Sequence, residues 1–150
     1  VLIGDGPEMS KVKEAAKGKS NIHLMGFQDT ATLRDHMQRA KAFVFAAEED
    51  FGIIPVEAQA CGTPVIAYGE GGARETVIPY RDGEQGATGV YFAQQTVESV
   101  IDAVRRFEAV SAHIHPASCR ANAERFSETI FRNRIHAIAH EAMQQREARA

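Results

Sequence analysis

Cysteine is scarce in this sequence of 150 residues, and positive charge is not in excess. Cys61 and Cys119 are the only cysteines, too few for a disulfide framework or a cysteine-based zinc site, and they suit a reducing compartment. We interpret both as small core residues. Because 17 basic residues stand against 20 acidic ones, for a net charge of -3, the chain offers no electrostatic footprint for a phosphate backbone. We therefore expect no nucleic-acid partner.

The chain also lacks a long apolar run. No basic segment followed by an apolar core opens it, and no run approaches the length needed to span a bilayer. We expect a cytoplasmic protein, associated with the inner membrane at most peripherally. The 44% of hydrophobic and 25% of charged residues are typical of one soluble globular domain.

The start of the chain has the composition of a domain interior. Val1-Leu2-Ile3 is typical of a buried strand and leads directly into the turn Gly4-Asp5-Gly6-Pro7. We therefore expect residues 1–150 to be one domain of a longer protein, truncated on its N-terminal side.

Short apolar runs alternate with amphipathic stretches along the first two thirds of the chain. Five strands are expected at residues 1–3, 21–25, 42–45, 64–67 and 89–92. Helices are expected between them at residues 8–17, 31–39, 54–61 and 72–77. Runs such as AFVF and PVIA are apolar on both strand faces, as in parallel sheets covered by helices on both sides. The pattern predicts a doubly wound, Rossmann-like α/β fold.

After Phe92 the pattern predicts helices only, at residues 96–107, after Pro116, and from Ser127 to the C-terminus. The last of these has an apolar stripe formed by Ile130, Phe131, Ile135, Ile138 and Ala142. Core packing is the more frequent role of such a stripe. Packing against a further domain would leave part of it exposed in this chain. Docking on a membrane surface or against a further domain of a longer protein are the alternatives.

The chemistry is expected in the loop at residues 46–53. Ligands of open parallel sheets bind at the carboxyl ends of the strands, where loops lead into helices. The helix that follows this loop holds Pro55 in its first turn, where a missing N–H costs nothing. Unpaired N–H groups and the helix dipole attract an anion at such a position, and a phosphate is the obvious candidate.

Three consecutive acidic residues, Glu48, Glu49 and Asp50, would repel a bare phosphate at this loop. A carboxylate accepts hydrogen bonds, however, and sugar hydroxyls donate them. A nucleotide-sugar therefore suits the site, with its diphosphate at the helix N-terminus. One glutamate would hold the transferred sugar, and Glu49 stands in that position. A second glutamate, one turn into the helix, would hold the ribose, and Glu57 stands there.

Glu49, seven residues and Glu57, inside EEDFGIIPVEAQACGTPVIA, resemble the EX7E signature of family 4 glycosyltransferases. GTPVIA at residues 62–67 resembles the next strand of that family, GGARE at 71–75 its GGxxE turn, and GDGP at 4–7 the second strand of its donor domain. EEDFG, IPVEA and GVYFAQQTVESVIDAVRRFE are most similar to the mannosyltransferases of O-antigen assembly.

This resemblance implies the C-terminal, donor-binding half of a GT-B fold and a retaining transfer of a hexose to a glycan or lipid-linked acceptor. It implies no metal and no cofactor, with GDP-mannose favoured over UDP-glucose as the donor. Glu49 would be the catalytic residue that orients the sugar, and Glu57 would hold the ribose. The other expected donor-binding residues are Phe51, Gly52 and Ile53 by their backbone, Phe27 at the base, and Gly4 and Asp5 of the GDGP turn.

Two parts of the family pattern are not found in this sequence. The arginine and lysine that neutralise the leaving diphosphate, and the acceptor-binding N-terminal domain, would both lie before Val1. We therefore expect this chain alone to be inactive. In the whole enzyme the nucleoside diphosphate would leave with attack from the same face, through an oxocarbenium-like state stabilised electrostatically.

Several plainer interpretations stand beside this one. Glu49 and Glu57 could be a solvated acidic loop and a surface helix position, or a glycosidase pair. The acidic triplet lacks the spaced carboxylates of a divalent-ion site. Met9 replaces the third glycine of a dinucleotide fingerprint.

At the level of function, the alternatives are a non-catalytic nucleotide-sugar binding module and a sugar-nucleotide epimerase of the same fold.

Histidines offer one further metal-binding pattern. His136 and His140 are one helical turn apart, a spacing that metal pairs use, but the sequence shows no third ligand for them. We expect no metal there. His113 and His115 flank a proline-bounded loop and are expected to face solvent.

Overall fold

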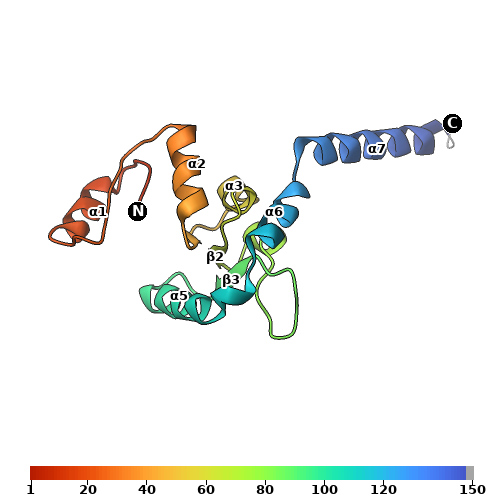
Figure 1. Cartoon of the computed structure of the whole chain (residues 1–150). Helices are drawn as coiled ribbons and strands as arrows, with labels where there is room; N and C mark the ends of the chain where they lie inside the picture. The colour runs from red at the N-terminus through yellow and green to blue at the C-terminus, as the bar shows by residue number, and fades with distance from the viewer. Residues whose placement is uncertain (148–150) are drawn as a thin grey trace.

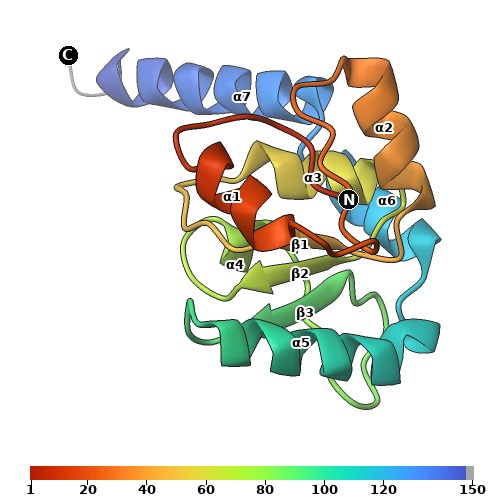
Figure 2. The same ribbon diagram turned by 90° about the vertical axis from the view of Figure 1, so that its left-hand side faces the viewer.

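A computed structural model describes residues 1–147, and its centre is a parallel sheet of three strands. The strands are β1 (Phe43–Phe45), β2 (Val65–Tyr68) and β3 (Gly89–Phe92), and they lie side by side in sequence order. Figure 1 shows the whole chain, and Figure 2 shows the three strands beside one another. In register, Val44 pairs with Ile66 and Ile66 with Val90. All three strands were expected within one residue of these bounds.

Helices separate and follow the strands. The helices are α1 (Met9–Ala16), α2 (Thr30–Arg39), α3 (Ile53–Ala60), α4 (Ala73–Thr76), α5 (Val97–Val110), the 3-10 helix η1 (Ser111–His113), α6 (Pro116–Glu124) and α7 (Glu128–Glu147). Local sequence explains several of their starts. The Asp29 carboxylate accepts a hydrogen bond from the Thr32 amide at 2.7 Å and caps α2. Pro116 occupies the first turn of α6, where its missing N–H costs nothing.

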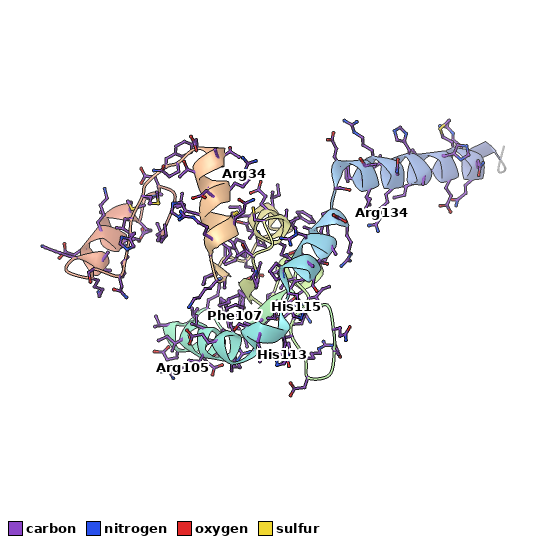
Figure 3. All side chains as sticks on the ribbon, viewed as in Figure 1. Arg34, Arg105, Phe107, His113, His115 and Arg134 are labelled. Atoms are coloured by element: carbon purple, nitrogen blue, oxygen red, sulfur yellow. The ribbon has the colours of Figure 1, made fainter. Side chains whose placement is uncertain are left out.

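The sheet has an apolar core on each face, which confirms the doubly wound prediction. Val65 and Ala67 of β2 pack with Ala58 of α3 and Met37 of α2. Ile66, one residue away and on the opposite face, packs with a different cluster. That second cluster includes Val90 and Phe92 of β3, and Ala103 and Phe107 of α5. Figure 2 shows α3 and α5 on opposite sides of the sheet, and Figure 3 shows Phe107 between α5 and the sheet.

The expected strands at residues 1–3 and 21–25 are wrong as members of the sheet. They form a single isolated parallel bridge between Leu2 and Leu24. Two backbone hydrogen bonds hold the bridge, from the Leu2 amide to the His23 carbonyl at 2.9 Å and from the Met25 amide to the Leu2 carbonyl at 3.0 Å. Among the described residues no strand connects this bridge to β1, whose central residue Val44 stays 47% exposed. A ladder without neighbours has too few hydrogen bonds and too little covered surface to extend.

The apolar stripe of the last helix does not pack into the core of the described residues. Phe131 and Ile138 are each 63% exposed, and Ile135 is 50% exposed. Figure 1 shows why, because α7 extends away from the sheet and no other element of the described chain covers it. Along the part of the chain that the structure describes, no helix combines the length and the apolar character needed to cross a bilayer.

Candidate functional site

Three loops meet at the carboxyl ends of the strands. The loop after β1 (residues 46–52) is bonded to the loop after β2, because the Gly72 amide donates to the Glu49 carbonyl oxygen at 2.7 Å. It is also bonded to the loop after β3, since the Gln95 side-chain amide donates to the Ala46 carbonyl oxygen at 2.8 Å. The backbone around Glu49 is therefore held from two neighbouring strands, at the edge where such sheets bind ligands.

The two glycines of the GGARE turn allow this close approach. A Cβ on Gly71 would lie 2.6 Å from the Glu49 carbonyl oxygen, and Gly71 has a φ of +62°, which other residues rarely adopt. A Cβ on Gly72 would lie 2.4 Å from both the Cα and the carbonyl oxygen of Phe51. In the sequence this turn is visible only as a family motif. In the structure, its glycines form the surface on which the acidic loop rests.

Gly52 begins helix α3 at the end of the same loop. It is buried and has a φ of +77°, so the chain turns sharply from the loop into the helix. No side chain caps the start of α3, and Pro55, in its first turn, is buried. The start of α3 therefore presents backbone N–H groups without a side-chain acceptor, which is the arrangement that attracts an anion. Phe51 and Ile53, on either side of Gly52, are both exposed.

Glu49 and Glu57 are both solvent-exposed, Glu49 on the loop and Glu57 within α3. Among the ion pairs of the described residues, neither carboxylate has a partner. Burial raises the pKa of the Cys61 thiol. The positive charge of Arg34 lowers this pKa, and the negative charge of Glu57 raises it. Arg34, which projects from α2 in Figure 3, and Glu57 therefore both lie within electrostatic range of Cys61.

Gly4, Asp5 and Phe27 form a second group. The Gly4 amide donates to the Gly26 carbonyl oxygen at 2.8 Å, which places the GDGP turn beside the turn that carries Phe27. The Asp5 carboxylate accepts a hydrogen bond from the Gly6 amide at 2.8 Å, and Phe27 is 86% exposed. In Figure 1 this N-terminal part lies on the far side of α2 from the sheet. The predicted donor residues thus stand in two groups, one around α3 and one at the Leu2–Leu24 bridge.

A buried polar network joins α3 to α4 and α6. The sequence did not indicate this network. The side-chain amide of Gln59 donates to the Pro55 carbonyl at 3.0 Å and to the Thr76 carbonyl at 2.8 Å. Asn122 of α6 donates to the Gln59 side-chain oxygen at 2.7 Å and to the same Thr76 carbonyl at 2.8 Å. Three helices are tied together here, because Gln59 lies on α3, Thr76 on α4 and Asn122 on α6. A glutamine and an asparagine at these positions look like ordinary surface residues in the sequence.

The remaining candidate groups lie away from these loops. Within residues 1–147, no three His, Cys, Asp or Glu side chains are grouped so as to hold a metal ion. His136 and His140 are exposed on α7. His113 and His115 are exposed at the corner between α5 and α6 (Figure 3), and the His113 ring stacks on Tyr80 with centroids 5.8 Å apart. Cys119 is fully buried, as expected of a core residue, whereas Cys61 is only partly buried.

The fold and the loop arrangement define the class of the protein as a doubly wound α/β domain whose ligand edge carries a glycine-supported acidic loop. Residues 1–126 match the family described as glycosyl transferases group 1. The chain belongs to this family. Its parallel sheet with flanking helices is the α/β architecture of the GT-B enzymes that it resembles.

Two relatives of known name are bacterial mannosyltransferases. Over 88 residues, which are 53% of this chain and 23% of the relative, the chain is 34% identical to the GDP-mannose-dependent monoacylated alpha-(1-6)-phosphatidylinositol monomannoside mannosyltransferase of Corynebacterium glutamicum. Over 115 residues, 69% of this chain and 28% of the relative, it is 30% identical to the GDP-mannose-dependent alpha-(1-6)-phosphatidylinositol monomannoside mannosyltransferase of Mycobacterium tuberculosis.

Solved structures of similar fold include sucrose-phosphate synthase and HepE. Sucrose-phosphate synthase from Thermosynechococcus elongatus superimposes with a TM-score of 0.70 at 24% identity, over 99% of this chain and 38% of that one. HepE from Anabaena, in complex with UDP, superimposes with a TM-score of 0.66 at 27% identity, over 93% of this chain and 40% of that one. The chain spans well under half the length of each of these relatives.

Proposed function

We propose that this chain is the donor-binding, C-terminal half of a retaining glycosyltransferase that takes a hexose from a nucleotide-sugar. The observation that carries the proposal is the clamping of the Glu49 loop on the Gly71-Gly72 turn, directly beside the uncapped start of α3. A rigid acidic loop next to free helical N–H groups suits a ligand that has both hydroxyls and phosphates. HepE, a solved relative at 27% identity, has been crystallised with UDP.

The proposed roles follow the chemistry of each group. The start of α3, with the backbone of Phe51, Gly52 and Ile53, holds the diphosphate. The carboxylate of Glu49 orients the transferred sugar, and that of Glu57 holds the ribose hydroxyls. Both carboxylates are exposed and free of ion pairs among the described residues, so they are available as acceptors.

Gly4, Asp5 and Phe27 are proposed to contact the remainder of the nucleotide. They share one corner of the chain through the Gly4–Gly26 hydrogen bond, and the exposed Phe27 ring offers a stacking surface for a base. This corner lies apart from the α3 group. A nucleotide-sugar that reaches both groups would have to bridge them.

GDP-mannose is the proposed donor, and this choice rests on relatives. Two of them carry GDP-mannose-dependent mannosyltransferase in their names, whereas the HepE complexes hold UDP or UDP-glucose. The proposed acceptor is a glycan or a lipid-linked sugar, met by an N-terminal domain on the cytoplasmic side of the membrane. No metal or cofactor is part of the proposal.

The chain alone is proposed to bind donor without transferring sugar. The Glu49 loop carries three consecutive acidic residues, and Arg74, on the neighbouring helix α4, is paired with Glu70 at 3.2 Å. Departure of a nucleoside diphosphate needs positive charge aimed at its oxygens. A longer form of the protein would have to supply those cations together with the acceptor site. If that longer form transferred no sugar, a non-catalytic binding module would be favoured.

Titration calorimetry of the chain against GDP, UDP and ADP tests the proposal. We expect weak binding with GDP preferred, and a reduction of about ten- to a hundredfold for Glu57→Ala, because a charge-assisted hydrogen bond contributes roughly 1.5–3 kcal/mol. Glu108→Ala is the matched control, since Glu108 is an equally exposed glutamate on α5, across the sheet. If the parent and Glu57→Ala each bound all three nucleotides with equal affinity, or bound none of them, the assignment of Glu57 to the ribose would be refuted.

A further inference from the structure

The corner between α6 and α7 touches the candidate donor loop through one aromatic pair. Phe126 lies between the end of α6 at Glu124 and the start of α7 at Glu128. Its ring meets that of Phe51 edge to face, with centroids 5.5 Å apart and planes at 72°. This is the preferred geometry of aromatic pairs. Phe51 belongs to the loop that carries Glu49, so a residue near the far end of the fold contacts the candidate site.

Phe51 is held on its other side by the glycine turn. Its backbone lies so close to Gly72 that a Cβ there would be 2.4 Å away. The residue is nevertheless 41% exposed, so its ring is not locked by a surrounding core. The backbone therefore rests on Gly72 while the ring rests on Phe126. Of these two supports, the one at Phe126 is made by the side chain of Phe51 itself.

Phe126 is itself anchored to the buried polar network. Its amide donates to the Ala123 carbonyl at 3.0 Å, and the Arg125 guanidinium lies 5.4 Å from the centre of its ring. Arg125 donates to the Asn122 side-chain oxygen at 2.7 Å, and Asn122 in turn donates to Gln59 of α3. One corner thus contacts both the loop that carries Glu49 and the helix that carries Glu57.

We infer that Phe126 is a positioning residue for the candidate donor site. Its ring holds Phe51, and through Phe51 it sets the backbone of residues 49–52 at the start of α3. Phe126 is not assigned a contact with the donor. The importance of this bracing for sugar transfer rests on the proposed function, whereas the bracing itself does not.

Hydrogen exchange measured by mass spectrometry tests, without any ligand, whether the Phe126 ring holds the Phe51 loop in place; this support is called the brace below. In Phe126→Ala we expect amides of residues 46–54 to exchange about two- to tenfold faster, which is the range that loss of an aromatic pair predicts. Phe126→Tyr, which keeps the ring, should restore slow exchange. Phe131→Ala is the matched control, because Phe131 is a 63% exposed phenylalanine in the first turns of α7. Unchanged exchange in a folded Phe126→Ala protein would overturn the inference.

A second variant covers the case in which Phe126→Ala does not fold. Phe126→Leu keeps most of the apolar volume and removes the aromatic edge, so the loop should exchange faster while the circular dichroism spectrum stays that of the parent. Combined with Phe51→Leu, it completes a double-mutant cycle. Non-additive exchange rates support direct coupling of the two rings, and strictly additive rates contradict it.

Calorimetry with GDP then separates the brace from the proposed function. We expect Phe126→Ala to bind GDP several-fold more weakly and Phe131→Ala to bind as the parent does. A loosened loop with unchanged GDP affinity would overturn the positioning role and leave the proposed function standing. Absence of nucleotide binding by the parent chain would refute the proposed function, and the exchange rates would still decide the brace.

Discussion

The Gly72 amide donates a 2.7 Å hydrogen bond to the carbonyl oxygen of Glu49, and this contact joins the loops that follow β2 and β1. It forms because Gly72 has no side chain to keep the two backbones apart. Glu49 is the residue expected to orient the transferred sugar, so the geometry of the candidate site depends on a glycine in another loop. The substitutions Gly72→Ala and Gln59→Leu test this arrangement and the packing of the helices beneath it.

Gly72→Ala is expected to displace the acidic loop. The new Cβ would lie 2.4 Å from the backbone of Phe51, and backbone cannot rotate away as a flexible side chain can. We expect a loss of about 1–3 kcal/mol in the free energy of unfolding and a large loss of GDP affinity. Urea unfolding and calorimetry measure the two effects. Gly6→Ala is the control, because nothing lies within 4 Å of a Cβ there, and it should match the parent in stability.

Gln59→Leu is expected to loosen the junction of α3, α4 and α6. The substitution removes the donor to the Pro55 and Thr76 carbonyls and the acceptor for Asn122, all in a buried position. An unsatisfied buried polar group costs about 1–3 kcal/mol, and we expect a loss of stability in that range. Gln38→Leu, at an exposed position of α2, should change the urea midpoint little. Equal midpoints for both variants would show that the network does not stabilise the fold.

The cap of α2 is expected to give the stability a dependence on pH. Hydrogen bonds from Thr32 to the Asp29 carboxylate hold its pKa below the ordinary value of 3.8. The folded state therefore binds its proton less readily than the unfolded state, so the stabilisation is complete above that value and is lost as pH falls through the lowered pKa. Asp29→Ala should destabilise the protein at pH 7, and by a smaller amount once the pH has fallen below the lowered pKa of Asp29.

Asp29→Asn is the control for that titration. Asparagine keeps an acceptor oxygen for the Thr32 amide but carries no proton in this range. Its unfolding free energy should therefore follow pH without the contribution of residue 29. If the parent and Asp29→Asn show the same profile between pH 5 and pH 2, the carboxylate has no part in acid destabilisation.

Cys119 is expected to resist alkylation in the folded protein. Burial raises the pKa of its thiol to about 11, and the side chain is fully enclosed. Because the folded state keeps a proton that the unfolded state releases near 9.0, this thiol should also reduce stability as pH rises from about 9 to 11. Iodoacetamide at pH 8, followed by mass spectrometry, should modify Cys119 only after urea is added. Rapid modification in the native state would contradict the burial.

Local sequence predicted the central strands and the loops between them well. The runs AFVF, PVIA and GVYF became β1, β2 and β3 because each is a short, mostly apolar run bounded by loops. The spacing of Glu49 and Glu57 placed one carboxylate on a loop and the other on the helix that follows it. Both features depend on neighbouring residues, which is why they could be read without a structure.

Contacts between distant segments could not be read in this way. The run at residues 1–3 has the same composition as a sheet strand, yet it forms only a bridge, because pairing depends on which strand is available beside it. The apolar stripe of α7 has helical spacing, yet Phe131 and Ile138 are exposed, because spacing does not say what covers a face.

The sequence by itself determined the family, the parallel order of alternating strands and helices, and the two glutamates at the ligand edge. Only the tertiary structure decided that Gly72 supports Glu49, that Phe126 supports Phe51, and that Gln59 and Asn122 share a buried network. The physical reason is the distance along the chain over which each interaction acts. Periodicity and turn chemistry act between residues close in the chain, whereas these contacts join segments that meet only when the sheet and its helices have packed.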